Sequence, residues 1–509
     1  MPRRARPNVL FIMTDQQRAD TIGALADSPI YTPNLDRLVH RGVTFTNAYS
    51  QCPVCVPARY NIRTGCEPTR TQYFENDGPG PDDGSVEDLT GSYLARAMRG
   101  RGYRTWGIGK HHTQPHREDL GYDVHLYSEE LYGTPEEYEA DDYAAFIERE
   151  YPEYSFLEQL HGERTEMYYM PQRSPLPAAI TVESWAADRA VREIQRDTDR
   201  PFFGFLSFIG PHPPLAPPIP FNRMYDPDRM PDPIRGEKAV DHMDEQIVWM
   251  NESIWAGEPD DIRTATLRAR YFGEISYIDQ CVGRVLDAVA SRDDADNTVI
   301  CFFADHGDGL GDHRAWQKES FFEQSCNVPF LVSWPAALPA GVVRNDLVCL
   351  TDLFGIATTA AGDPEIRDGV DVIGMITGEA PSRERLLGVH RPPGSRDFKC
   401  MVREGNWKYI FMANGGREQL FNVKEDPEEV EQMIDDRPTV ANRLRDAACE
   451  MLRIRGADAA LQDGGETLRE YPFRKRPVDR IKQLAAHQGI TDFPDEPADT
   501  LDEWELESP

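Results

Sequence analysis

The sequence predicts an α/β fold in which a large, mostly parallel sheet is flanked by helices. Short, uninterrupted apolar runs recur along the chain, as in strands that are buried on both faces. Segments with one apolar helical face lie between these runs. Polar residues follow several of the runs directly, at the carboxyl ends of the predicted strands. Ligand sites of such folds gather at these ends.

The first predicted strand is the apolar run NVLFIM at residues 8–13, which ends at Thr14-Asp15-Gln16. A helix is expected to begin at Pro33, because proline fits the first turn of a helix and Thr32 can cap it. Gly42 is expected to end this helix. Strand and helix together form the first unit of the alternation.

Further strands and a long helix continue this pattern. The run PFFGFLSFIGPH predicts a buried strand at residues 201–212 that leads into a proline-rich loop. Residues 271–290 place their apolar side chains on one helical face. The run NTVICFFADHGD then predicts a strand that ends at Asp305-His306, and residues 328–334 predict another.

The chain is expected to divide into a catalytic α/β domain at residues 1–385 and a smaller unit at residues 386–509. Short strand-like runs alternate with turns in the smaller unit, which indicates an antiparallel sheet followed by a helix. Residues 491–509 contain eight acids and no base, as expected of a solvated tail. Residues 129–177 are rich in Tyr and Glu, match no element and are expected to shape a substrate pocket.

The composition limits the partners of the protein. Its formal net charge is −32 over 509 residues, which argues against nucleic acid and anionic membranes, because both need a basic surface. The apolar run near the N-terminus is too short for a signal peptide or a membrane span, and nine cysteines are scattered along the chain. We therefore expect a cytoplasmic protein. The acidic tail or the small unit could support a homo-oligomer, and the sequence does not decide this.

Two pairs of polar residues, Asp15-Gln16 and Asp305-His306, come directly after predicted strands. Because strand ends meet at one edge of a parallel sheet, these side chains can converge. Two carboxylates, an amide oxygen and an imidazole suit a divalent cation. The alternative for each pair alone is structural: Asp15 would cap a helix, and Asp305-His306 would begin a turn.

Cationic and titratable residues follow the predicted strands or lie in the next loops. Lys110 and His112 alternate at the end of a strand-like run, so both can point the same way. His212 lies in the proline-rich loop, and His313 and Lys318 lie beyond Asp305-His306. Each is unremarkable alone, but together they indicate an anion pocket beside the metal site.

The stretch SQCPVCVPARYNIRTG at residues 50–65 admits more than one interpretation. Cys52 and Cys55 have the spacing of a redox pair or of half a zinc site, and Cys55 could also be an ordinary buried thiol. The sequence has no second pair of this kind to complete a zinc site. Neither the redox pair nor the zinc site explains Pro57 and Arg59.

Taken together, these motifs resemble the type I sulfatases of the alkaline-phosphatase superfamily, and the resemblance covers most of the chain. The C-terminal KYIF and LFNVKEDPEE segments are similar to the small domain of that family. The motifs that carry the resemblance are Cys55-x-Pro57-x-Arg59 with Thr64-Gly65, Gly102-Tyr103-x-Thr105-x-x-x-Gly109-Lys110-x-His112, Pro211-His212, Asp305-His306-Gly307 with Gly311-x-His313, and Lys318.

The resemblance implies an alkaline-phosphatase-like fold and an unusual nucleophile. A dedicated formylglycine-generating enzyme reads Cys-x-Pro-x-Arg and oxidises the cysteine, here Cys55, to formylglycine. The hydrated aldehyde then carries two hydroxyls: one attacks sulfur and expels the alcohol, and the other loses its proton as sulfate leaves and the aldehyde returns. Ala58 stands where the family usually has serine, a residue that the core of the signal does not require.

The resemblance also assigns roles to the candidate residues. Arg59 would steady the hydrate, and His212 or His112 would protonate the leaving oxygen. Asp15, Gln16, Cys55, Asp305 and His306 would form the metal site. Gln16 and His306 replace a second Asp and an Asn of many sulfatases, so calcium is expected, with manganese or magnesium as alternatives. The residues expected to bind the sulfate group are Lys110, His112, His212, His313 and Lys318.

Two rival functions remain, one from the same superfamily and one from another class. Gln16 and the proline-rich loop are also similar to phosphonate monoester and phosphodiester hydrolases of the same superfamily. The pair Lys110 and His112 favours a sulfate monoester instead. A catalytically silent binder of sulfated ligands, with Cys55 left as a thiol, is the second rival. The sequence leaves open whether the alcohol is a carbohydrate, an aryl group or a small alkyl group.

Overall fold

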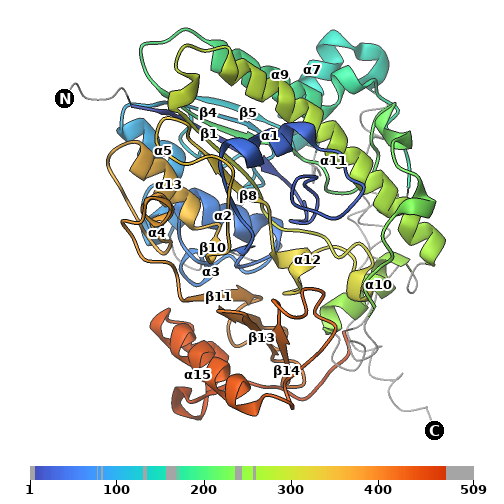
Figure 1. Cartoon of the computed structure of the whole chain (residues 1–509), viewed down its shortest axis with the longest axis vertical. Coiled ribbons are helices and arrows are strands. Elements are labelled where there is room, and N and C mark those ends of the chain that lie inside the picture. The colour runs from blue at the N-terminus through green and yellow to red at the C-terminus, as the bar shows by residue number, and fades with distance from the viewer. Residues whose placement is uncertain are drawn as a thin grey trace.

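The centre of the protein is an eight-stranded sheet that is mostly parallel, as the sequence predicts (Figure 1). The five strands β5, β4, β6, β1 and β7 run parallel to one another, whereas β8 is antiparallel to both of its neighbours. The strands in spatial order are β5 (Val124–Tyr127), β4 (Arg104–Gly109), β6 (Phe202–Ser207), β1 (Asn8–Thr14), β7 (Thr298–Ala304), β8 (Phe330–Ser333), β2 (Val43–Phe45) and β9 (Val342–Arg344).

The structure is a computed structural model of the chain. The residues that it describes are 6–76, 78, 80–81, 84–129, 135–155, 169, 171–235, 244–255 and 260–476. The acidic tail at residues 491–509 and most of residues 156–170 lie outside this part.

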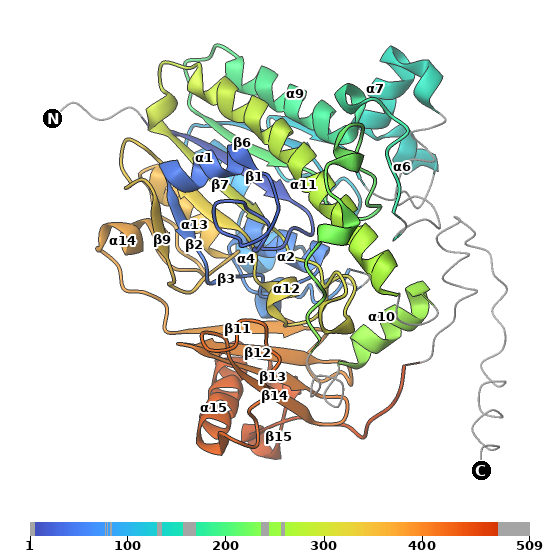
Figure 2. The same ribbon diagram turned by 45° about the vertical axis from the view of Figure 1, so that its right-hand side comes forward.

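Strand β1 explains why the sheet needs helices on both faces. Its side chains alternate, so Phe11 contributes to the core on one face and Leu10 and Ile12 to the core on the other. Each of these side chains is fully buried. One face is covered by α1 (Pro33–Arg41), α9 (Val182–Gln195) and α11 (Asp261–Ala290), and the other by α2 (Cys55–Thr64), α5 (Leu94–Gly100) and α13 (Asp352–Ala360) (Figure 2).

The expected cap of α1 is supplied from elsewhere in the chain. Thr32 precedes the helix, but its side chain makes no capping hydrogen bond and instead accepts from the backbone N–H of Gly23. The first-turn N–H groups of Asn34 and Leu35 donate to Asp279 of α11, at 3.1 and 2.7 Å. The prediction of a Thr32 cap is therefore wrong, because a carboxylate on a packed neighbouring helix takes its place.

Two predicted boundaries also differ from those observed. The strand expected at residues 201–212 ends at Ser207, although the apolar residues Phe208 and Ile209 that follow are buried in the loop. Helix α11 begins at Asp261, well before residue 271, and the side chain of Asp260 accepts a hydrogen bond from Arg263 N–H at its start. None of the described helices has an apolar stretch long enough to cross a bilayer.

The C-terminal part is a four-stranded antiparallel sheet followed by a helix, which confirms the expected architecture (Figure 2). Helix α15 (Pro438–Ile454) covers one face of this sheet. The other face shares a core with the catalytic part, where Met401 and Phe421 pack with Tyr49 and Phe321. The strands are β11 (Arg385–His390), β12 (Lys399–Glu404), β13 (Trp407–Met412) and β14 (Arg417–Asn422). Because the core is shared, the division after residue 385 stays a prediction.

Buried charges join the small sheet to the catalytic part. The ammonium of Lys408 on β13 is fully buried and lies 2.8 Å from Glu323 Oε1 and 2.5 Å from Glu429 Oε1. Glu323 begins α12 (Glu323–Cys326), which follows the loop that carries Lys318. Removing one partner of a buried ion pair leaves an uncompensated charge in a dry environment. The contact thus fixes one end of this loop against the small sheet.

We predict that Lys408→Met lowers the free energy of unfolding by about 3–5 kcal/mol, because Glu323 and Glu429 lose their buried counter-charge. Urea unfolding midpoints measure the change. Lys475→Met is the matched control, since Lys475 is 61% exposed and its ion pair with Glu252 lies at the surface. It should cost less than about 1 kcal/mol. Equal effects of the two substitutions would contradict a structural role for the buried pair.

Candidate active site

Four neighbouring parallel strands end at the same edge of the sheet and deliver the polar residues of the site. In spatial order these strands are β4, β6, β1 and β7. Lys110 follows β4, His212 lies five residues beyond the end of β6, Asp15 follows β1, and Asp305 follows β7. Residues far apart in sequence therefore meet because their strands are parallel and adjacent, as the sequence predicts.

Helix α2 brings Cys55 to this edge from a different direction. Cys55 is the first residue of α2, and Arg59 lies one turn later, so both side chains lie on the same side of the helix. Pro57 falls in the first turn, where a missing N–H costs no helical hydrogen bond. Ala58 packs into the apolar core below the sheet. The departure from the family motif at Ala58 thus lies away from the Cys55 sulfur.

The ligand atoms of Asp15, Cys55, Asp305 and His306 lie within 4.8 Å of one another, and all four residues are buried. Two carboxylates and an imidazole in a dry site form a donor set that a divalent cation prefers. The side-chain oxygen of Gln16 lies beside this group, where it accepts a hydrogen bond from Lys318 Nζ at 3.2 Å. The residues present therefore fit a divalent cation.

Arg59 decides which carboxylate oxygens are left for such a cation. Its Nη2 donates to Asp15 Oδ2 at 2.7 Å, and its Nε donates to Asp305 Oδ2 at 3.0 Å. The other oxygen of each carboxylate turns toward the centre of the site. Asp15 Oδ1 lies 3.6 Å and Asp305 Oδ1 3.7 Å from His306 Nε2. Arg59 thus holds two like charges together and orients both.

The proximity of these charges shifts the pKa values of the site. Burial and the neighbouring Asp15 raise the pKa of Asp305 above its ordinary value. Burial also acts to raise the pKa of Asp15, as does the Cys55 sulfur, but the surrounding cations outweigh both and the pKa lies well below its ordinary value. A bound cation would reduce the repulsion between the carboxylates of Asp15 and Asp305.

The cations around Cys55 form an anion pocket. Lys318 Nζ lies 3.0 Å and Lys110 Nζ 4.0 Å from the Cys55 sulfur, and the side chain of His112 also hydrogen-bonds this sulfur. Burial acts to raise the pKa of the Cys55 thiol, but Lys110 and Lys318 lower it well below its ordinary value. His112 is held by its backbone N–H, which donates to Glu129 Oε1 at 2.5 Å.

His212 and Lys318 form a pair that can pass a proton. His212 Nδ1 lies 3.0 Å from the carbonyl oxygen of Pro213, which can only accept, so Nδ1 carries the proton. Its Nε2 lies 2.8 Å from Lys318 Nζ and accepts from this ammonium. Lys318 thus lies between His212 and the Cys55 sulfur, where the two side chains can pass a proton.

The ring of His313 contacts an aromatic side chain. Its ring stacks on Phe322 with centroids 4.0 Å apart, and burial lowers its pKa to about 4. Its backbone N–H donates to the carbonyl oxygen of Ile234. Its sequence position after Asp305-His306 predicts an anion contact, and this role stays a prediction.

Two residues of the site were not found from the sequence. Asp308 is fully buried and accepts from Gln16 Nε2 at 2.6 Å. Tyr169 donates to the same carboxylate at 2.5 Å. The position of Asp308 just after Asp305-His306-Gly307 was an available signal, since it too follows β7. Tyr169 lies in the segment that matches no element, and no spacing pointed to it.

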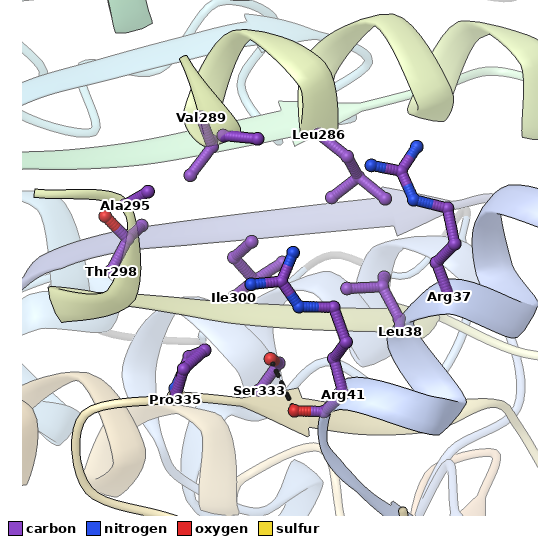
Figure 3. A pocket seen from close by; sticks show the side chains of 11 residues that line it. Arg37, Leu38, Arg41, Leu286, Val289, Ala295, Thr298, Ile300, Ser333 and Pro335 are labelled. Carbon is purple, nitrogen blue, oxygen red and sulfur yellow. Dashed lines mark hydrogen bonds between the residues drawn. The ribbon is translucent and has the colours of Figure 1, made fainter. Parts of the chain in front are cut away.

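A separate pocket lies at the opposite end of the sheet, near the start of β7 (Figure 3). Leu38, Leu286 and Ile300 form apolar walls, and Arg37 and Arg41 stand at its side. Both guanidinium groups pair with exposed carboxylates of Asp287 and Asp296. The Ser333 hydroxyl in this pocket donates to the carbonyl oxygen of Arg41, and no carboxylate or imidazole is among the lining residues, so we assign the catalytic chemistry to the Cys55 edge.

A family model described as Sulfatase matches residues 7–362, more than half of the chain. The chain belongs to the sulfatase family. A second model, described as N-sulphoglucosamine sulphohydrolase, C-terminal, matches residues 311–453. The protein is therefore a sulfuric ester hydrolase with the fold of the alkaline-phosphatase superfamily, as its motifs indicate.

Curated relatives match this sulfatase along nearly its whole length. An arylsulfatase of Clostridium perfringens is 27% identical and covers 92% of this chain and 98% of its own. A choline-sulfatase of Rhizobium meliloti is also 27% identical and covers 94% of this chain and 95% of its own. Among solved structures, a phosphonate monoester hydrolase of Agrobacterium radiobacter superposes with a TM-score of 0.72 at 24% identity. The superposition covers 92% of this chain and 100% of that one. This last likeness shows the fold.

We predict that Ca²⁺, Mn²⁺ or Mg²⁺ raises the melting temperature of the chelator-treated enzyme, because a cation relieves the repulsion between Asp15 and Asp305. Asp305→Asn should abolish the increase, since it removes one of the charges and a ligand. Thermal melts with and without each metal measure the effect. Asp296→Asn is the control, because the side chain of Asp296 is 78% exposed. A metal-induced increase that persists in Asp305→Asn would place the cation elsewhere.

Proposed function

We propose that this sulfatase hydrolyses sulfate monoesters with a formylglycine residue made from Cys55 and with a divalent cation, calcium in the first instance. One observation carries the proposal: the Cys55 sulfur lies 3.2 Å from His306 Nε2 and 3.0 Å from Lys318 Nζ. A nucleophile at this place touches both the candidate metal ligands and the cations that would hold the sulfate group. The sulfur stands where the oxygens of the hydrated aldehyde would lie.

The modification supplies a nucleophilic hydroxyl for attack on sulfur and a second hydroxyl whose loss of a proton releases sulfate. The cation, held by Asp15, Gln16, Asp305 and His306, would activate this nucleophile as a Lewis acid. The chain itself does the positioning. Arg59 donates to Asp15 and Asp305 from beneath residue 55, so the nucleophile and both carboxylates are fixed relative to one another.

The cationic side chains complete the reaction. Lys110, His112 and Lys318 surround the Cys55 sulfur and would neutralise the sulfate oxygens as charge develops. The leaving alcohol needs a proton, and the Lys318–His212 pair supports its delivery because the two nitrogens are 2.8 Å apart. The proton that the second hydroxyl of the hydrate loses as sulfate leaves would then be accepted by the same pair and restore it, while the carbonyl oxygen of Pro213 accepts from His212 Nδ1.

The substrate class is a sulfate monoester of a carbohydrate, an aryl alcohol or a small alcohol. The curated relatives carry the names arylsulfatase and choline-sulfatase, which span aryl and small alkyl alcohols. Carbohydrate sulfates belong to the class because a protein of the same fold was solved with its substrate D-glucosamine-2-N,6-O-disulfate, at a TM-score of 0.66 and 18% identity over 91% of this chain and 99% of that one.

A second candidate activity is hydrolysis of phosphonate monoesters or phosphodiesters. The observation that favours it is the metal-ligand set, in which Gln16 and His306 give fewer negative charges than a set with a further Asp. Lys110 argues for sulfate, because its ammonium lies beside both Asp15 and the Cys55 sulfur. A silent binder of sulfated ligands is the third possibility, and turnover distinguishes it.

We predict that mass spectrometry of the tryptic peptide Gly42–Arg59 finds an aldehyde in place of the Cys55 thiol when the formylglycine-generating enzyme is present during expression. Ala58 should not prevent this, because its side chain packs into the core. The Cys55→Ala variant serves as the control for the assignment of the peptide. A thiol that persists under these conditions would contradict the proposed nucleophile.

We predict a larger kcat/KM for an aryl sulfate than for an aryl phosphonate monoester. Lys110→Ala should lower the sulfate value by roughly 10²–10³, the effect of removing one donor from a preorganised anion site. Steady-state kinetics on the metal-loaded enzyme measure both, with the exposed Lys475→Ala as control. A preference for the phosphonate would support the second candidate, and binding of aryl sulfate without turnover would support the silent binder.

A further inference from the structure

One buried carboxylate, Asp308, connects three parts of the active site. Its side chain is fully buried. Its Oδ2 accepts from Gln16 Nε2 at 2.6 Å and from the Tyr169 hydroxyl at 2.5 Å. Its Oδ1 accepts from the backbone N–H groups of Leu310 and Gln317, at 2.9 and 3.0 Å. The carboxylate thus receives four hydrogen bonds from the part of the chain that the structure describes.

The orientation of the Gln16 amide follows from this carboxylate. A carboxylate oxygen can only accept, so the atom of Gln16 that faces Asp308 must be the NH₂ nitrogen. The same nitrogen lies 3.0 Å from the Tyr169 hydroxyl, which accepts from it while donating to Asp308. The amide oxygen is therefore directed the other way, toward Lys318 Nζ at 3.2 Å and the metal-ligand group.

We propose that Asp308 is a positioning residue that presents the oxygen of Gln16, rather than its nitrogen, to the catalytic cation. The inference rests on the cation of the proposed function. An amide is a ligand only through its oxygen, and either end of the side chain fits the same space. Lys318 Nζ favours the oxygen on its own side, and a fixed acceptor on the other side selects the same orientation independently. Asp308 makes this selection, and Tyr169 supports it.

The same carboxylate holds the loop that carries Lys318. Gln317 has a positive φ of 69°, which is unusual for a residue with a side chain. Its N–H donates to Asp308 Oδ1, so the carboxylate stabilises this backbone directly before Lys318. Lys318 Nζ in turn donates to the Gln16 oxygen. One oxygen of Asp308 therefore holds Gln16, a proposed metal ligand, and the other holds the backbone of the loop that carries Lys318.

Asp308→Asn should reverse the orientation of the Gln16 amide. The new NH₂ group can only donate, and when it faces Gln16 the amide of Gln16 turns its oxygen toward residue 308 and its nitrogen toward the cation. The cation then loses a ligand and meets a donor. Loss of such an orienting partner typically weakens metal binding by about 10–100-fold. We expect a decrease of this size in affinity for Ca²⁺ or Mn²⁺.

A double-mutant cycle separates orientation from loop support. Gln16→Glu supplies an oxygen at both ends of the side chain, so in the Asp308→Asn background one end can accept from the new amide while the other binds the cation. In the unsubstituted background the new carboxylate would face Asp308 at a short distance. We therefore compare how far Gln16→Glu lowers the dissociation constant of the cation in the two backgrounds. The factor should be at least about tenfold larger in the Asp308→Asn background than in the Asp308 background. Isothermal titration of chelator-treated protein measures all four constants.

The control is Asp279→Asn. Asp279 is equally buried and also accepts from an amide side chain, Asn34 Nδ2, and from backbone N–H groups, but it belongs to α11 and contacts the first turn of α1. The substitution should lower the melting temperature and leave the dissociation constant of the cation unchanged.

Two results would overturn the inference alone: unchanged metal affinity in Asp308→Asn, or an equal effect of Gln16→Glu in both backgrounds. Absence of metal binding by the unsubstituted protein would overturn the proposed function with it. Retained metal binding with no turnover of sulfate esters would count against the proposed reaction and leave the role of Asp308 standing.

Discussion

The ion pairs of Arg59 with Asp15 and Asp305 are the constraint on which the site depends. The two carboxylates come from adjacent strands, are fully buried, and would repel each other without a counter-charge. A charge of this kind in a dry environment must be paired. Arg59 pairs with both while it lies one helical turn from Cys55. The residue that keeps the carboxylates together therefore also sets the distance between them and the nucleophile.

The surrounding architecture protects this arrangement. The parallel strands β4, β6, β1 and β7 fix the edge at which the side chains meet, and helices on both faces bury the sheet. The small sheet holds α12 through the ion pair of Lys408 with Glu323, and α12 follows the loop that carries Lys318. Asp308 anchors the same loop from inside. The loop that carries Lys318 is thus held both by the small sheet and by Asp308.

The electrostatics of the site contrast with those of the whole chain. The net charge of −32 opposes an anionic substrate at long range. Lys110 and Lys318 are nearly or fully buried beside Cys55, where their charges are weakly screened. Specific capture of a sulfate group therefore depends on a few preorganised cations in a dry site and on the cation that the carboxylates would hold, while the acidic surface limits non-specific binding of other anions.

The sequence alone determined the fold class, the strand ends that carry Asp15 and Asp305, and the family, because apolar runs and motif spacing are local properties. Only the tertiary structure decided the rest. Asp279 rather than Thr32 receives the first N–H groups of α1, since capping depends on what packs nearby. His313 stacks on Phe322. Asp308 and Tyr169 fix Gln16, although they lie far from it in the chain. Hydrogen-bond partners at long range are chosen by packing, and packing leaves no periodic signal in a sequence.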